Sequence, residues 1–371
     1  MSSFKPVIAE MKQRKALSLL SICGALAVVV CGIAIFSMID STATSGPGKI
    51  FSSFKHTPNP LKDKQLYVYP DSPAAKQAAA WRTERPVQAA IMDTMAAIPT
   101  ARWVGDDERF EDLAIQLDKV RQENKLALTV LYDIPGRDCG LYSAGGAKDA
   151  VAYQQFVDRF AEAIGETQTI VIVEPDAIPQ MDETDDRGRP CLDAKEREVR
   201  TGLLDYAVGK LKALPHTYVY LDAGNSSWDL DPEQVVAYLK DSGIGKADGF
   251  SLNVSNFRST KESTEHGVKL SKMLDDAHFV IDTSRNGNGP YDNKKRPDFN
   301  WCNPPGRALG QYPTFNTGHP LVDALLHIKI PGESDGQDPD PLKCSGGPAA
   351  GEWWPEYALG LVERWPAGLR N

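Results

Sequence analysis

Aspartates follow short apolar runs at four separate places in the sequence. They are Asp138, Asp176, Asp222 and Asp335, and the apolar runs before them cover residues 128–132, 170–173, 218–221 and 325–330. A short apolar run is typical of a buried strand in a parallel sheet. In α/β barrels the residues beyond the strand ends form the rim where catalytic groups collect. Any one of these aspartates could instead cap a helix or form a turn, but four in the same context favour an acidic active site.

Carboxyl groups that lie close together can serve as acid and base in one reaction. Crowding raises their pKa values, so one can stay protonated near neutral pH while another is ionised. Hydrolysis of a glycosidic bond needs this combination, because one group protonates the leaving oxygen while the other activates water or attacks carbon. The four aspartates therefore predict an enzyme with an acidic cleft.

Aromatic and polar side chains near the same strand ends suit a sugar ligand. Trp103, Trp228 and Trp301 lie at or just beyond expected strand ends, where their flat faces could stack on sugar rings. Packing in the core is the alternative for each of them. Five further residues could hydrogen-bond sugar hydroxyls, or could be ordinary surface or capping residues: Asn253, Asn256, Arg285, Lys329 and Glu333.

The net charge and the absence of certain motifs argue against three classes of function: nucleic-acid binding, metal binding and catalysis by a serine nucleophile. The chain has 371 residues and a formal net charge of −9, which argues against nucleic acid as a partner. Its six histidines are scattered and no CxxC pair occurs, so no dedicated metal site is expected. No GxSxG sequence is present for a serine nucleophile.

Strand and helix patterns alternate about seven times, which predicts a parallel α/β fold. The expected strands cover residues 99–104, 128–132, 170–173, 218–221, 249–254, 279–282 and 325–330. A barrel fits better than an open dinucleotide-binding sheet. No GxGxxG follows the first strand, and polar residues occur at the end of every strand rather than at one switch point. The loop at 286–320 is long enough to suggest a functional role.

The N-terminal part predicts export from the cytoplasm. Residues 16–39 are 24 residues without a charged side chain, preceded by four basic residues, Lys5, Lys12, Arg14 and Lys15. Such a run can span a bilayer as a helix with the basic segment 1–15 inside, or it can be a cleaved signal peptide. Residues 40–65 are expected to form a linker, and residues 66–371 a catalytic domain outside the cell, membrane-anchored or secreted.

Four cysteines lie outside the apolar segment, at Cys139, Cys191, Cys302 and Cys344. An even number of cysteines in an oxidising compartment suggests disulfides. Four cysteines allow three pairings, and the sequence alone leaves the choice open. Pairing 139 with 191 and 302 with 344 would join neighbouring loops.

Six ordered blocks of the sequence resemble glycoside hydrolase family 6, whose members are endoglucanases and cellobiohydrolases. The first block, 132–140, reads Tyr-Asp-Ile-Pro-Gly-Arg-Asp-Cys-Gly, and the second, 173–176, reads Val-Glu-Pro-Asp. Similar blocks follow in the family's order at 220–224, 281–287, 301–303 and 329–336. The resemblance covers roughly residues 66–370.

This resemblance implies a distorted, partly open seven-stranded barrel that hydrolyses β-1,4-glucan with inversion at the anomeric carbon. It makes Asp176 the general acid, Asp335 the candidate base, Asp138 the group that keeps Asp176 protonated and relays a proton, and Asp222 a support. Inversion requires acid and base about 6.5–9.5 Å apart. The family pairs 139 with 191 and 302 with 344, and it needs no metal or cofactor. The substrate-binding candidates implied are Tyr132, Arg137, Trp103, Trp228, Trp301, Lys329 and Glu333.

The chain departs from the family pattern at Asn225, His327 and Phe257, which affects expected substrate contacts more than the acid. The region between Cys302 and Cys344 lacks the long insertion that roofs a cellobiohydrolase tunnel, which favours an open cleft and cleavage of internal bonds. The alternatives are an exo-acting cellobiohydrolase and a non-catalytic glucan-binding protein of the cell surface. A monomer is expected.

Overall fold

The computed structural model describes residues 58–370, apart from 106–108, 186–187, 293 and 295–299. The basic segment 1–15, the apolar segment 16–39 and most of the linker 40–65 lie outside the described residues and stay predictions. None of the described helices is both long enough and apolar enough to cross a bilayer. The expected domain start at residue 66 also stays a prediction, although Leu61 is already fully buried and Asn59 Nδ2 donates to the carbonyl of Asp323 at 2.7 Å.

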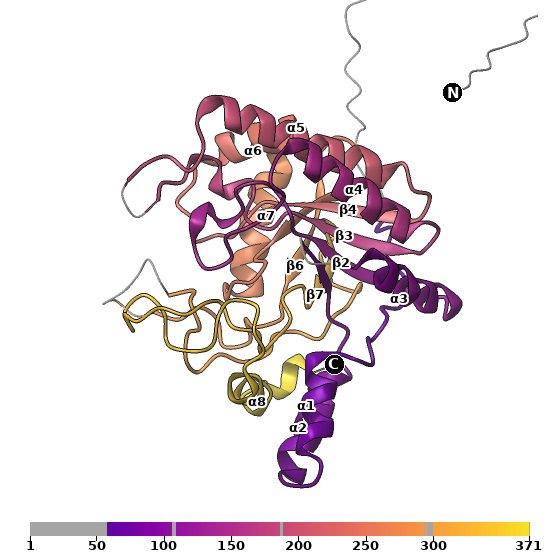
Figure 1. The fold of residues 1–371 in the computed structure, drawn as a ribbon, viewed down its shortest axis with the longest axis vertical. Helices are drawn as coiled ribbons and strands as arrows, with labels where there is room; N and C mark the ends of the chain where they lie inside the picture. Colours follow the sequence, from indigo (N-terminus) through magenta and orange to yellow (C-terminus); the bar gives the residue numbers. More distant parts are fainter. Residues whose placement is uncertain (1–57, 106–108, 186–187, 293, 295–299, 371) are drawn as a thin grey trace, which may run out of the picture. The chain divides into compact units, whose positions relative to one another are not determined.

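Seven parallel strands form one sheet in chain order, which confirms the predicted strand number and direction. Each strand pairs with the next one along the chain, as in a barrel (Figure 1). The strands are β1 (Arg102–Val104), β2 (Ala127–Leu131), β3 (Thr169–Val173), β4 (Thr217–Asp222), β5 (Gly249–Leu252), β6 (His278–Asp282) and β7 (Val322–Leu326).

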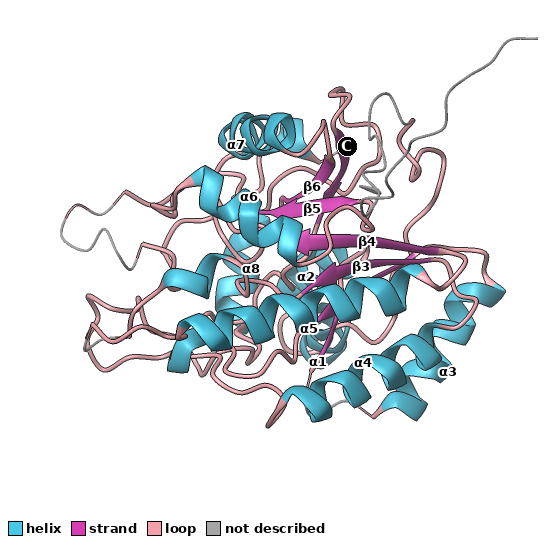
Figure 2. Ribbon diagram, turned by 90° about the horizontal axis from the view of Figure 1, so that it is seen from above, coloured by secondary structure: helices cyan, strands magenta, loops and turns pink. Residues whose placement is uncertain are grey.

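Helices connect successive strands from β1 to β6 and cover one face of the sheet. Figure 2 shows this layer from above, and neighbouring helices of the layer pack on one another. Its members are α3 (Phe110–Gln122), α4 (Ala150–Ile164), α5 (Ala194–Lys212), α6 (Pro232–Asp241) and α7 (Thr260–Met273). The described residues between β6 and β7 form no helix. A separate group packs α1 (Pro73–Trp81), α2 (Pro86–Ala96) and α8 (Pro355–Glu363) around its own apolar cluster.

Local sequence explains where these helices begin. Asp193 and Glu196 form a capping box at the start of α5, and Ser259 and Glu262 form another at the start of α7. Each box satisfies backbone donors that the first turn leaves without partners. Pro86 occupies the first position of α2, where a missing N–H costs nothing, so α2 begins there as a helix separate from α1.

The strands separate two apolar layers, because successive side chains of a strand point to opposite faces. Leu128, Val130, Ile170 and Ile172 belong to the inner layer, while their sequence neighbours belong to the outer layer under the helices. Burying one such side chain contributes roughly 1.5–3 kcal/mol. Both faces of the central strands are therefore dry, which explains their continuous apolar runs.

The barrel is only partly closed, as the family resemblance implies. No ladder joins β7 to β1 within the described residues. Hydrogen bonds span the seam instead: the N–H of Ala101 donates to the carbonyl of His327 at 3.0 Å, and Trp103 Nε1 donates to the carbonyl of Ile328 at 2.8 Å. The structure thus holds the seam with single bonds rather than a strand pair.

The predicted extent of the last strand is wrong. The apolar run predicts a strand over 325–330, but β7 covers Val322–Leu326. Asp282, the last residue of β6, accepts hydrogen bonds from the N–H groups of Ile328 (3.2 Å) and Lys329 (3.0 Å). Because a side chain takes these backbone donors, the chain leaves the sheet early and Lys329 lies beyond the strand end.

Candidate active site

The candidate residues come from six different strand ends, and parallel strands bring these ends to one edge of the barrel. We call this edge the rim, meaning residues at and just beyond the carboxyl ends of β1–β7. The loop after β2 carries Asp138, the loop after β3 carries Asp176, β4 ends at Asp222, and the loop after β7 carries Asp335.

Asp176 is held in an unusual backbone conformation beside Asp222. Its φ is +69°, and that of Glu174 two residues earlier is +48°, both in the left-handed region that costs free energy for a non-glycine residue. The backbone N–H of Asp176 donates to Oδ2 of Asp222 at 2.9 Å. Burial, followed by the charges of Asp222, Asp138 and Glu183, raises the pKa of Asp176 well above its usual value. This carboxyl group is therefore suited to carry a proton near neutral pH.

Asp222 is a fully enclosed partner whose carboxylate is shared among three donors. Besides the N–H of Asp176, it accepts hydrogen bonds from Ser251 Oγ (3.0 Å) and the N–H of Gly224 (3.2 Å). Burial raises its pKa to about 6, and the three donors act against that rise. With both oxygens engaged by the protein, Asp222 fixes the loop of Asp176.

Asp138 lies half-buried in a short 3₁₀ turn, η1 (Asp138–Gly140), with φ +61°. Its Oδ2 accepts from the N–H of Ser143 at 2.6 Å and its Oδ1 from Gln180 Nε2 at 3.3 Å. Burial raises its pKa above the usual value, against the lowering effect of these bonds. The pairing of the adjacent Cys139 with Cys191 is confirmed.

Asp335 forms a two-point ion pair with Arg285, which follows β6. The Nη2–Oδ1 and Nη1–Oδ2 distances are 2.8 and 3.0 Å, and Arg285 is fully buried. The N–H of Asn303 donates to Oδ2 at 3.0 Å, and the N–H of Asp335 donates back to Asn303 Oδ1 at 2.8 Å.

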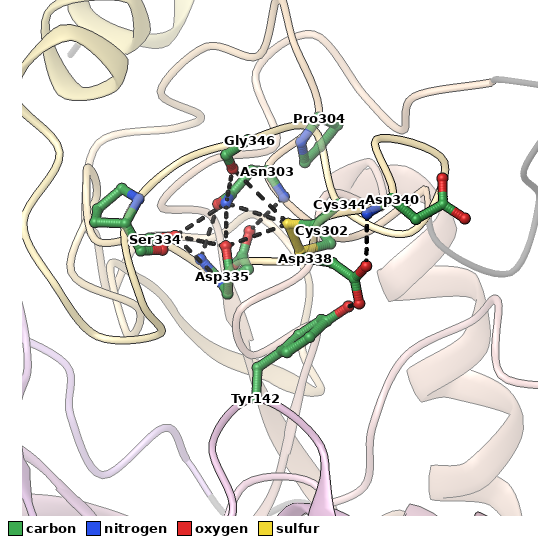
Figure 3. Close-up of a disulfide and its surroundings, with 12 residues drawn as sticks. Tyr142, Cys302, Asn303, Pro304, Ser334, Asp335, Asp338, Asp340, Cys344 and Gly346 are labelled. Carbon is green, nitrogen blue, oxygen red and sulfur yellow. Dashed lines mark hydrogen bonds between the residues drawn. A yellow bond between two sulfur atoms is a disulfide. The ribbon is translucent and has the colours of Figure 1, made fainter. Parts of the chain in front are cut away.

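The loop of Asp335 is tied to the preceding loop through Asn303 and the second disulfide (Figure 3). Asn303 Nδ2 donates to Ser334 Oγ at 2.9 Å and to the carbonyl of Gly346 at 2.7 Å. The disulfide joins Cys302 to Cys344, so this predicted pairing is also confirmed. Two distant segments therefore hold the carboxylate of Asp335 in place.

Five substrate-binding candidates form one aromatic and charged group on the rim. The rings of Trp103 and Tyr132 meet edge to face with centroids 5.1 Å apart. Arg137 lies over the Tyr132 ring at 4.4 Å, and Lys329 Nζ lies over the Trp103 ring at 5.6 Å. Lys329 also pairs with Glu333 at 3.3 Å. Burial, with the charges of Asp176 and Asp138, raises the pKa of Tyr132, so its hydroxyl keeps its proton.

Two further tryptophans lie half-exposed on other loops. Trp228 Nε1 donates to Glu183 Oε1 at 2.7 Å, and the Trp301 ring lies 6.0 Å from the ring of Tyr142.

Two residues expected to meet sugar hydroxyls instead support loops. Asn253 is fully buried, and its Nδ2 donates to the carbonyls of Asp282 (2.8 Å) and Arg258 (3.2 Å). Arg285 is fully buried against Asp335. These two expectations are corrected, because neither side chain reaches the surface. Asn256 is half-buried and its Oδ1 accepts from the N–H of Phe257 at 2.8 Å.

The three departures from the family pattern lie inside the domain. Asn225 is 7% exposed, Phe257 1% and His327 0%. Burial lowers the pKa of His327 to about 4, so the imidazole is neutral near pH 7. The effect of these three departures on substrate contacts stays a prediction.

Sequence reasoning gave no role to several buried carboxylates around the rim. Glu174 accepts from the N–H groups of Asp133 and Ile134, each at 3.0 Å, and Asp282 accepts four backbone donors from three loops. An aspartate directly after the apolar run of β6 could have revealed Asp282, as for Asp222. Among the described residues, no group of three or more His, Cys, Asp or Glu could hold a metal ion.

Comparison with known proteins identifies relatives of this domain. The family model "Glycosyl hydrolases family 6" matches residues 61–365. Endoglucanase A of Cellulomonas fimi is 38% identical over 299 residues, which are 79% of this chain and 61% of that protein. Endoglucanase 1 of Streptomyces halstedii is 36% identical over 306 residues, 80% of this chain and 88% of that protein.

A solved structure is similar in both sequence and fold. The endoglucanase Cel6 from Mycobacterium tuberculosis, in complex with methyl-cellobiosyl-4-deoxy-4-thio-β-D-cellobioside, is 38% identical with a TM-score of 0.74. The match covers 82% of this chain and 99% of that one.

Proposed function

The chain belongs to glycosyl hydrolases family 6, and from that premise we propose that it hydrolyses internal β-1,4-glucosidic bonds of a β-glucan with inversion at the anomeric carbon. The observation that carries the proposal is the carboxyl group of Asp176, whose pKa burial and neighbouring acids raise, within a cluster of acids on an aromatic-lined rim. The named endoglucanase relatives support the substrate class.

Asp176 is the general acid in this proposal. It donates its proton to the glycosidic oxygen as the bond from that oxygen to the anomeric carbon breaks. The fixed backbone and the shared carboxylate of Asp222 keep the acid in position, so little reorganisation is needed during the reaction. Burial and the nearby charges keep the proton on Asp176 until the oxygen takes it.

Water attacks the anomeric carbon from the face opposite the breaking bond and gives up a proton to the carboxylates of the site. Asp138 relays this proton, and its contacts to Ser143 and Gln180 orient its carboxylate for that role. Asp335 is the candidate base. Arg285 holds Asp335 in position through the two-point ion pair, and the Asp335 side chain is 5% exposed.

The sugar chain lies over the aromatic groups. Tyr132 is positioned below the reacting sugar, with Trp103 beside it, while Lys329 and Glu333 hold hydroxyl groups. Trp228 and Trp301 provide further platforms. Arg137 orients Tyr132 through the contact with its ring and a 2.6 Å bond to its carbonyl.

The place of action is outside the cell. Two disulfides form and persist in an oxidising compartment, which supports export of the domain. Retention of the segment 16–39 as an anchor, or its cleavage, stays a prediction.

Substitution of the acid tests the proposal. In the oxidised full-length chain, Asp176→Asn should lower hydrolysis of carboxymethyl cellulose and mixed-linkage glucan at least about 100-fold, because the proton donor is lost. Binding of a cello-oligosaccharide, measured by calorimetry, should survive.

Three outcomes separate the alternatives. Unchanged hydrolysis by Asp176→Asn contradicts the assignment of the acid. Glucan binding without hydrolysis by the unsubstituted chain supports a binding protein. A slow fall in viscosity relative to the release of reducing ends identifies exo-cleavage.

A further inference from the structure

Glu183 is a carboxylate on the rim that the proposed mechanism does not use. It lies at the base of a hairpin, where Thr184 pairs antiparallel with Pro190 and the N–H of Cys191 donates to the carbonyl of Glu183 at 2.8 Å. The disulfide of Cys191 ties the end of this hairpin to Cys139, next to Asp138. The base of the hairpin is thereby fixed to the loop that carries a catalytic candidate.

The side chain of Glu183 forms a hydrogen bond with the indole ring of Trp228. Its Oε1 accepts from Trp228 Nε1 at 2.7 Å, and this N–H is the only polar group that a tryptophan side chain offers. The ring is packed from another side at Gly224, where an added Cβ would lie 3.1 Å from Trp228 Cε3 and 2.6 Å from Pro179 Cγ. Contacts on two sides fix the orientation of a half-exposed aromatic platform.

Glu183 also faces the acids of the rim. Asp138 from the loop after β2 and Asp176 from the loop after β3 both interact with its charge. Burial and the charge of Asp138 raise the pKa of Glu183, while the bond from Trp228 lowers it. Asp222 at the end of β4 and Tyr132 directly after β2 also interact with Asp176.

We propose that Glu183 is a positioning residue that orients Trp228 for a bound sugar ring and places a negative charge beside the acids Asp138, Asp176 and Asp222. The inference rests on the proposed β-glucan hydrolysis and adds a residue outside the six blocks of family resemblance. It predicts two separable effects, one on sugar binding through the hydrogen bond and one on the proton of Asp176 through the charge.

Two substitutions separate these effects. Glu183→Gln keeps an oxygen that can accept from Trp228 Nε1 but removes the charge, whereas Glu183→Ala removes both. Asp182→Asn is the matched control, because this neighbouring exposed residue loses the same charge but bonds Tyr238 on α6 at 2.9 Å.

The expected results differ for each variant with a soluble cello-oligosaccharide. Glu183→Ala should raise KM by about 5- to 10-fold, the effect of one lost hydrogen bond, while Glu183→Gln stays within about twofold. Both should shift the alkaline limb of the kcat/KM profile to lower pH by at least about 0.3 unit, because Asp176 loses a nearby negative charge. Asp182→Asn should match the unsubstituted chain in both respects.

Binding in the Asp176→Asn background gives a readout independent of turnover. Calorimetric titration with the same oligosaccharide should show weaker binding only when Glu183→Ala is added. If Glu183→Ala and Asp182→Asn are indistinguishable in KM, pH profile and binding, the inference is wrong. If the unsubstituted chain neither binds nor cleaves the oligosaccharide, the proposed function itself has failed. Should Glu183→Ala fail to fold, the pH profile of Glu183→Gln alone decides.

Discussion

Glu174 carries an ionisable group in the dry interior directly below the rim. It is 1% exposed, and burial raises its pKa from 4.5 to about 7, against the lowering effect of donors from Asp133 and Ile134. The folded state therefore binds a proton that the unfolded state has released between these two pH values. The stabilisation is fully present below the unfolded pKa and is lost as the pH rises through the folded pKa.

We expect the stability of the domain to fall between pH 4.5 and 7, with Glu174 contributing about 3 kcal/mol of that fall at most. The buried Asp222, whose pKa is raised to about 6, contributes in the same direction. Glu174→Gln removes one titration, so its urea midpoints at pH 4.5, 5.5 and 7 should vary less than those of the parent. Glu166→Gln, at an exposed position, is the control and should leave the slope unchanged. Equal slopes for all three proteins would contradict this prediction.

Helix α5 positions the two loops that carry the acid and its relay. Arg200 on this helix is 3% exposed, and its guanidinium donates to the carbonyls of Pro135 (3.0 Å), Gly136 (3.1 Å) and Ala177 (3.3 Å). These carbonyls belong to the loops after β2 and β3. One buried cation therefore links the Asp138 loop to the Asp176 loop.

Arg200→Met should leave these carbonyls without donors and loosen both loops. We expect a loss of about 2–3 kcal/mol of stability and a fall in kcat of at least about 10-fold, because misplacement of a proton donor costs rate. Lys195→Met removes a charge from an exposed position of the same helix and should change neither quantity. Chemical denaturation and initial rates provide the measurements. A stable, fully active Arg200→Met protein would show that α5 does not position the loops.

Elements buried on both faces were predictable from sequence, whereas details that depend on distant partners were not. The apolar runs of β2 and β3 predict their strands, because every residue of these strands is buried and so must be suited to the interior. The end of β7 depends on Asp282, whose carboxylate accepts hydrogen bonds from the backbone N–H groups of Ile328 and Lys329, 46 and 47 residues later in the chain.

The same limit applies to the site. Four acids and the aromatic residues could be placed on the rim from their position after strands. The burial of Asn253 and Arg285 could not be predicted from the sequence. Asparagine and arginine also suit contacts with sugar hydroxyls, and only the packing of the folded loops shows that these two side chains are buried. Glu183 does not directly follow a strand and belongs to none of the six blocks, so its bond to Trp228 appears only in three dimensions.

At the scale of the whole domain, two disulfides join loops that no strand pairing holds together within the described residues. Their cysteines are separated by 52 and 42 residues, and closing loops of this length stabilises a fold by about 2–5 kcal/mol. The second bridge also encloses the segment from Asn303 to Asp335 (Figure 3).

Replacing Cys302 and Cys344 together by serine should therefore lower stability by about 2–5 kcal/mol and reduce kcat under conditions where the variant is still folded. Activity and near-ultraviolet circular dichroism, followed along a thermal ramp, measure both effects. The unsubstituted chain treated with reductant should behave similarly. If the double variant retains full kcat, Asn303 and Arg285 suffice to place Asp335 without the bridge.

The stereochemistry of the product tests the central claim most directly. Cleavage of a cello-oligosaccharide by the oxidised full-length chain, followed by proton NMR from the first minutes, should show the α-anomer of the new reducing end before mutarotation produces the β-anomer. This order is the consequence of direct attack by water opposite the bond that Asp176 protonates. The Asp176→Asn variant should show neither anomer on this time scale. Appearance of the β-anomer first would mean a covalent intermediate and retention, and would contradict the assigned roles of Asp176, Asp138 and Asp335.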